Sequence, residues 1–184
     1  MMTFISRKEL NLIKEYRLLW NQHAEWTRMV INALVLQSPN VQEEADRLLR
    51  NPVDFGKALE VFYGQCIAAQ FANLLTEHLK IAAELTTAMM AGDGTEVERI
   101  TCLFFQNGNE IALFLGSINP YWSYMEWREM FFTHLRYVQD LIRTMVNKEY
   151  GENTRIYDLY ELEILEMADT MSSGIIRQFF CRYC

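Results

Sequence analysis

The sequence has few of the residues that interrupt helices. Its 184 residues include only 8 glycines and 3 prolines. This argues against a turn-rich β fold and favours long helices. Long hydrophobic runs are also missing, because the longest apolar stretch, 111–118, is far too short to cross a bilayer and contains a Gly-Ser pair. The first residues do not have the layout of a signal peptide. We therefore expect a soluble, cytoplasmic protein with no membrane partner.

Dense positive charge and a disulfide framework are absent as well. The formal net charge is −7 and no stripe of Lys and Arg is visible, so we do not expect nucleic-acid binding. Four cysteines in a chain of this size do not resemble a disulfide scaffold. Cys66 and Cys102 fall within helical patterns and are predicted to be small apolar residues. Cys181 and Cys184 form a terminal C-x-x-C without a second ligand pair, and we assign it no function.

Several catalytic and metal-binding motifs are missing. The chain contains no H-E-x-x-H, no P-loop and no nucleophile elbow. A ferritin-like di-iron centre needs Glu three residues before a ligating His on two helices. The residues three before the histidines are instead Trp20, Leu75 and Phe131. A di-iron site of that class is therefore excluded.

What the sequence does contain is apolar periodicity with 3–4 spacing throughout, and 51% of its residues are hydrophobic. The pattern predicts an all-α, antiparallel up-and-down bundle of four to five long helices with one short accessory helix. We expect a single domain over 1–184 with a loose tail at 180–184 and no internal repeat. The expected helices cover about 6–36, 41–49 (the short one), 51–90 with a kink at Gly64, 95–117, 124–148 and 154–179.

One polar residue interrupts the apolar stripe near the middle of each long helix. These residues are His23, His78, Asn107, His134 and Asp169. Short turns make neighbouring helices antiparallel, so depth can be counted from each turn at a rise of 1.5 Å per residue. The count places His78, Asn107, His134 and Asp169 at one depth, within about one turn. The count assumes that the chain reverses at Gly151, between the last two helices.

His23 is the least certain member of this layer. A direct hairpin would place it opposite Cys66, roughly 18 Å from His78. It joins the layer only if the short helix carries the chain along the bundle before the next long helix begins. We expect this arrangement.

The layer supports three hypotheses. In the first, His23, His78 and His134 supply nitrogen ligands and Asp169 a carboxylate to a divalent Zn, Fe, Mn or Ni ion, with Asn107 in an outer shell or orienting a substrate. A metal-dependent enzyme is its more specific form. In the second, the protein is non-catalytic, and the polar layer only fixes helix register in an interaction or oligomerisation protein. In the third, an aromatic wall binds an apolar ligand. A small-molecule ligand and a homodimer are compatible with these hypotheses.

Two further features have open interpretations. Gly108 lies in mid-helix, where glycine costs about 1 kcal/mol relative to alanine, and it marks either a kink or a close approach. The acidic run Glu161, Glu163 and Glu166 is predicted to be a solvated helix face.

Several segments resemble a bacterial family of short, all-helical proteins to which no activity is firmly attached, and the resemblance covers nearly the whole chain. They are Leu19-Trp-Asn-Gln-His-Ala-Glu-Trp-Thr-Arg28, Arg47-Leu-Leu-Arg-Asn-Pro52, Phe62-Tyr-Gly64, Ser117-Ile-Asn-Pro-Tyr-Trp122 and Met167-Ala-Asp169 with Gly174-Ile-Ile-Arg-Gln-Phe179. Some members carry an acetylglutamate kinase label, but amino-acid kinases are α/β proteins with glycine-rich phosphate loops, and neither feature is present. The family pattern ends near Phe179, so the terminal Cys-Arg-Tyr-Cys departs from it. A bundle with a histidine-rich centre is also similar, more distantly, to the DinB-like metal-binding bundles, although those usually pair two histidines on one helix.

Overall fold

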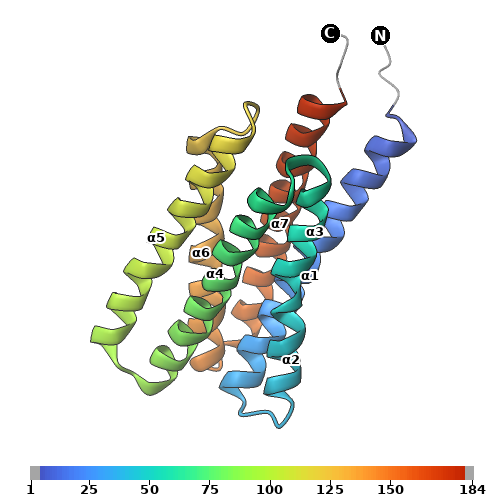
Figure 1. Ribbon diagram of the computed structural model, residues 1–184. Helices are drawn as coiled ribbons and strands as arrows, with labels where there is room; N and C mark the ends of the chain where they lie inside the picture. Colours follow the sequence, from blue (N-terminus) through green and yellow to red (C-terminus); the bar gives the residue numbers. More distant parts are fainter. Residues whose placement is uncertain (1–4, 181–184) are drawn as a thin grey trace.

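The computed structural model describes residues 5–180, and this part of the chain folds into seven helices without a strand. The predicted all-α bundle is confirmed (Figure 1). The helices are α1 (Arg7–Val35), α2 (Val41–Leu48), α3 (Arg50–Tyr63), α4 (Gln65–Ala91), α5 (Gly94–Ile118), α6 (Tyr124–Val146) and α7 (Tyr150–Phe179).

The helices form three antiparallel hairpins arranged in a closed ring. Helix α1 runs down the bundle and α2 with α3 returns up it, after which α4 and α5, then α6 and α7, repeat the same path (Figure 1). Each hairpin packs against the next, and α7 packs against α1 to close the ring. The descending helices α1, α4 and α6 also contact one another. Side chains from these three helices can therefore meet at the centre.

The expected single helix over 51–90 is wrong. Gly64 has φ 80° and ψ 166°, ends α3 and reverses the chain into α4. Glycine tolerates this backbone, which is strained for other residues. Gly56 of α3 lies against Ala68 and Ala72 of α4, as expected for two antiparallel helices joined at Gly64. The predicted kink is thus a hairpin.

The three hairpins carry buried residues at matching positions, whereas the expectation of no internal repeat concerns the residue types, which differ. Buried positions recur at intervals of 55 or 56 residues. On the first helices these include Tyr16, Phe71 and Trp127; Trp20, Leu75 and Phe131; and His23, His78 and His134. On the second helices they include Phe55, Ile111 and Met167, and Leu59, Leu115 and Met171. The repeat is carried by burial and helix phase, and the residue types differ too much to show it in the sequence.

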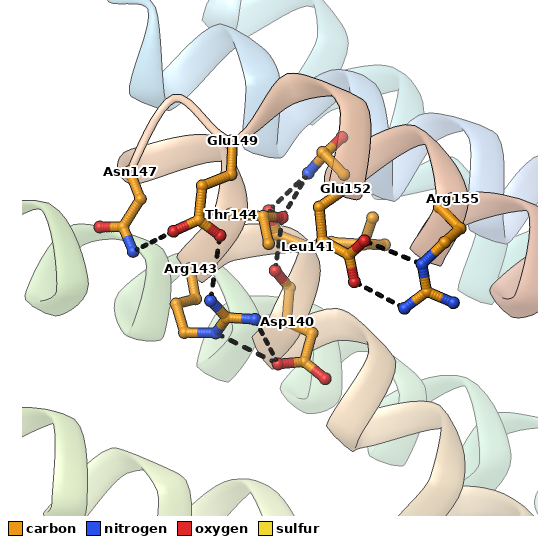
Figure 2. A network of polar contacts seen from close by, with 9 residues as sticks. Asp140, Leu141, Arg143, Thr144, Asn147, Glu149, Glu152 and Arg155 are labelled. Atoms are coloured by element: carbon orange, nitrogen blue, oxygen red, sulfur yellow. Dashed lines mark hydrogen bonds and ion pairs between the residues drawn. The ribbon is translucent and has the colours of Figure 1, made fainter.

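The turn between α6 and α7 is held by a polar network (Figure 2). Lys148 has φ 60°, and Asn147 and Arg143 both donate to the Glu149 carboxylate. Asn153, at the start of α7, donates to the Leu141 carbonyl and the Thr144 hydroxyl of α6. The turn is therefore centred on 147–149, and this fixes the register of α7 against α6.

Gly108 marks a close approach between helices. A Cβ atom there would lie 3.0 Å from Leu135 Cδ1 and 3.6 Å from Phe131 Cβ. Helices α5 and α6 pack directly across this position, and α5 continues through it.

Two other expectations concern the cysteines and the termini. Cys66 and Cys102 lie within α4 and α5, as their helical patterns predict, and both are exposed. Phe180 caps α7 and its ring lies 6.0 Å from that of Phe62, so the predicted loose tail does not begin there. The rest of that tail, with Cys181 and Cys184, lies outside the described residues. A search of residues 5–180 finds no helix with the length and apolarity needed to cross a membrane.

Gly174 gives a test of this packing. A Cβ there would lie 1.9 Å from Trp122 Nε1, which donates to the Thr170 carbonyl. We expect Gly174→Ala to lower the free energy of unfolding by about 1–3 kcal/mol through overpacking. Gly151→Ala on the same helix meets open space and should be neutral or stabilising by up to about 1 kcal/mol. Urea denaturation measures both, and equal stabilities of the two variants would contradict the packing.

Candidate metal centre

The three histidines meet at the centre of the bundle. His23 of α1, His78 of α4 and His134 of α6 are each no more than 2% exposed. Their ring centroids are 6.0 Å apart for His23 and His78 and 5.6 Å apart for the other two pairs. One ring nitrogen of each lies within 4.8 Å of the other two. The geometry is close to threefold.

His23 reaches the layer because α2 and α3 together carry the chain up the bundle before α4 descends. Helices α1 and α4 are therefore parallel, and His23 and His78 lie twelve and thirteen residues before the ends of their helices. His23 lies in the layer as expected, but the expectation that the short helix carries the chain there holds only in part. Helix α2 has 8 residues, and α3 supplies the other 14 of the return.

Two asparagines orient two of the imidazoles in the same way. His23 Nδ1 lies 3.1 Å from Asn51 Oδ1, and His78 Nδ1 lies 3.0 Å from Asn107 Oδ1. Each amide nitrogen donates to a backbone carbonyl four residues before its histidine, Leu19 for Asn51 and Leu74 for Asn107. The amide oxygens must therefore accept from Nδ1–H, which leaves the Nε2 lone pair of both rings free. A hydrogen bond from Nδ1–H to a neighbouring oxygen fixes the ring orientation of a histidine that binds a metal through Nε2.

Asn107 contacts His78 within the layer, at the depth that the sequence predicts. Asn51 is only the first residue of the helix expected over 51–90, and its contact with His23 is not predicted. The signal that could have found it is its spacing of 28 residues from His23, against 29 between His78 and Asn107.

The third imidazole faces a carboxyl group. His134 Nδ1 lies 3.4 Å from Glu163 Oε2, and Glu163 is 8% exposed. Within the described residues, neither oxygen of Glu163 has a hydrogen-bond partner, nor has His134 Nδ1. Glu163 is 29 residues after His134 and therefore takes the position that Asn107 has in the second hairpin. The expectation that Glu163 lies on a solvated face is wrong, although Glu161 and Glu166 are exposed.

Asp169, expected as the carboxylate ligand, lies outside the layer, so that prediction is wrong. Its side chain is about half exposed and pairs with Arg17, whose Nε donates to Oδ1 at 2.7 Å. The error arose from the turn, because Gly151 lies within the first turn of α7 and the chain reverses at 147–149. Counting from that turn reaches Glu163, almost two helical turns earlier.

Burial determines the charge states of the layer. It lowers the pKa of His134 to about 3. Burial and the neighbouring His134 lower the pKa of His23 to about 3 and that of His78 well below its usual value, where His23 adds to the effect. Burial, with a smaller contribution from Glu166, raises the pKa of Glu163 to about 9. At neutral pH without a metal, the layer is three neutral imidazoles beside a protonated carboxyl.

Aromatic rings enclose the histidines. Trp20 and Trp127 are fully buried with ring centroids 6.4 Å apart, and Phe131 packs on both. The rings of Phe104 and Tyr160 lie 4.8 Å from His78 and 5.1 Å from His134. These aromatics are part of the hydrophobic core. A surface groove of about 500 Å³ between α4 and α5, towards their turn, is lined by other residues.

Comparison with protein-family models gives no match, and comparisons with curated proteins and with solved structures give no significant similarity. The resemblance to the bacterial helical family stays a prediction.

The pKa shifts predict how the stability of the metal-free protein depends on pH. In the folded state the histidines stay neutral down to about pH 3, whereas in the unfolded state they bind protons below about pH 6.5. The free energy of unfolding therefore decreases as the pH falls below about 6.5. Glu163 keeps its proton in the folded state up to about pH 9 but loses it above about 4.5 when unfolded, so stability falls as pH rises over this window. Stability should therefore be greatest near pH 6.5.

The variant Glu163→Gln tests the cause of the predicted fall in stability at alkaline pH. Glutamine does not ionise, so the loss of stability between pH 7 and 9, at most about 1.4 kcal/mol per pH unit, should become smaller. Thermal unfolding in the presence of a chelator measures it. An alkaline decline equal in both proteins would contradict the assignment to Glu163.

Proposed function

We propose that the protein binds one divalent transition-metal ion, Zn²⁺, Fe²⁺, Mn²⁺ or Ni²⁺, through Nε2 of His23, His78 and His134. The observation that carries the proposal is the convergence of three buried imidazoles whose Nδ1 atoms each face a side-chain oxygen. This leaves Nε2 of each ring free to bind a metal ion. A set of three histidines with an open fourth position is typical of catalytic zinc sites.

The distances support this proposal. Three atoms 4.8 Å apart lie about 2.8 Å from their common centre, and ligand nitrogens need about 2.0–2.1 Å. Closing the site therefore requires each nitrogen to move inward by about 0.7 Å at most, which small side-chain rotations can supply.

The charge states also fit a metal centre. Metal ligation requires neutral imidazole, and the histidines are already neutral at pH 7 because of burial. Glu163 would act on His134 as the asparagines act on the other two rings, with the difference that a carboxylate can compensate part of the metal charge. Asn51, Asn107 and Glu163 are thus outer-shell groups.

An oxygen-activating or hydrolytic enzyme is the more specific form of the proposal, since three protein ligands leave room for water or substrate. We expect the protein to work in the cytoplasm, because exposed free thiols such as Cys66 and Cys102 suit a reducing compartment.

A second candidate function has its own observation. The hydrogen bonds of Asn51 and Asn107 link neighbouring helices and would fix their register without any metal. In that case the layer would serve a non-catalytic interaction or oligomerisation protein, for example a homodimer.

Metal analysis distinguishes the two candidates. Protein purified without chelator or nickel affinity resin should contain about one equivalent of a transition metal or take it up on reconstitution. At a hundredfold excess over the Kd, binding stabilises the fold by about 2.7 kcal/mol, which raises the Tm by roughly 5–10 °C. Each of His23→Ala, His78→Ala and His134→Ala should abolish this shift.

The control is Asn153→Ala, which removes another buried polar side chain that joins two helices, far from the layer. It should lower the Tm and still show the metal-induced rise. Less than a tenth of an equivalent of metal, with no stabilisation by Zn²⁺, Fe²⁺ or Mn²⁺, would refute the metal proposal and favour the register function.

A further inference from the structure

The threefold repeat identifies where the site departs from symmetry. One turn after the histidines, on the same helix face, the equivalent residues are Thr27, Ala82 and Val138. On the returning helices the equivalents are Leu48, Phe104 and Tyr160, and Asn51, Asn107 and Glu163. In the first set only Thr27 is polar, and in the second only Tyr160 is. In the third set only Glu163 is ionisable.

All three exceptional residues lie on one pair of neighbouring helices. Thr27 is on α1, while Tyr160 and Glu163 are one turn apart on α7, which packs against α1. They form what we call the polar corner of the layer. The Tyr160 ring lies 5.1 Å from His134, and Glu163 lies 3.4 Å from it. The polar corner is thus in direct contact with the proposed ligands.

The polar corner contains oxygen atoms that have no hydrogen-bond partner within the part of the chain described. They are Thr27 Oγ1, Tyr160 Oη and both carboxyl oxygens of Glu163. The residues are 4%, 0% and 8% exposed. A buried polar group without a partner costs about 1–3 kcal/mol. Burial raises the pKa of Tyr160 well above its usual value, and the neighbouring Thr27 hydroxyl opposes this shift. The two hydroxyls are therefore adjacent, and one bound ligand could pair with both.

The opposite side of the layer is lined by larger side chains. One turn before the histidines the equivalent residues are Trp20, Leu75 and Phe131, which are fully buried. Within the described residues that side also holds one unpaired polar atom, Trp20 Nε1, carried on a bulky ring. Thr27, Ala82 and Val138 are smaller, and the additional ligand of the metal is therefore assigned to the side of Thr27.

We propose that the hydroxyl groups of Thr27 and Tyr160 in the polar corner hold the exchangeable fourth ligand of the metal ion, a water molecule or a small anion that accepts hydrogen bonds from both, while Glu163 keeps its place behind Nδ1 of His134. This inference rests on the proposed function, because it assumes a metal held by the three histidines. The first and third hairpins supply Thr27 and Tyr160 to the exchangeable ligand, whereas the second hairpin contributes His78 to the metal and Asn107 behind that histidine.

The experiment uses azide as the probe on protein loaded with Co²⁺, whose visible absorption reports coordination. Wild-type protein should bind azide saturably. Thr27→Val and Tyr160→Phe install the residue types of Val138 and Phe104 from the other hairpins. Each removes one hydrogen bond to the ligand and should weaken azide binding about tenfold without changing the Co²⁺ stoichiometry.

The matched control is Thr86→Val. Thr86 is fully buried on α4 and its hydroxyl donates to the Ala82 carbonyl, so the same chemical change is made outside the polar corner. Its azide affinity should equal that of the wild type. Circular dichroism and Co²⁺ stoichiometry confirm that each variant is folded and loaded.

The outcomes separate the two proposals. A wild-type protein that takes up no Co²⁺ would overturn both. Stoichiometric Co²⁺ without azide binding, or azide binding that is equal in wild type, Thr27→Val and Tyr160→Phe, would overturn the polar corner and leave the metal site in place. Weaker azide binding in Thr86→Val equal to that in the two corner variants would also overturn it.

Discussion

The burial of three imidazoles at one depth is the constraint on which the rest of this structure depends. A neutral imidazole placed in a core needs a partner for Nδ1–H, and Asn51 and Asn107 supply it from the returning helices. Each asparagine is itself held by a carbonyl four residues before its histidine. These contacts fix the register within two of the hairpins. The Asn147–Glu149 turn does the same for the third, where Glu163 faces His134.

Depth counting from the sequence succeeded where helices are continuous and turns are short. It brought His78, Asn107 and His134 together because α4, α5 and α6 are joined by turns whose position the sequence marks with Gly92 and Pro120. It failed for α7, where Gly151 marked the wrong place. The actual turn uses Lys148 with φ 60°, which no composition rule indicates. The resulting shift of six residues exchanged Glu163 for Asp169.

The sequence also could not reveal how Gly64 acts. A glycine inside a periodic helical pattern fits a kink as well as a reversal, and only the packing of Gly56 against Ala68 and Ala72 distinguishes them. The repeat is likewise not recognisable in the sequence, because apolar residues of different types occupy the equivalent buried positions. Trp127, Phe71 and Tyr16 are interchangeable for packing but not for sequence comparison. The threefold relation is therefore visible in spacing and burial only.

The composition of the layer argues for binding in addition to register. Two asparagines paired with two histidines already align the helices, and their polar atoms within the layer are satisfied. Glu163, Tyr160 and Thr27 add unpaired oxygen atoms to this arrangement and so destabilise it. A layer that only aligns helices would gain nothing from these unpaired oxygens. Leu48 and Phe104, at the positions equivalent to Tyr160 in the other hairpins, pack without an unpaired polar atom. A metal ion with a small ligand would pair the hydroxyls of Thr27 and Tyr160, whose equivalents in the other two hairpins are apolar.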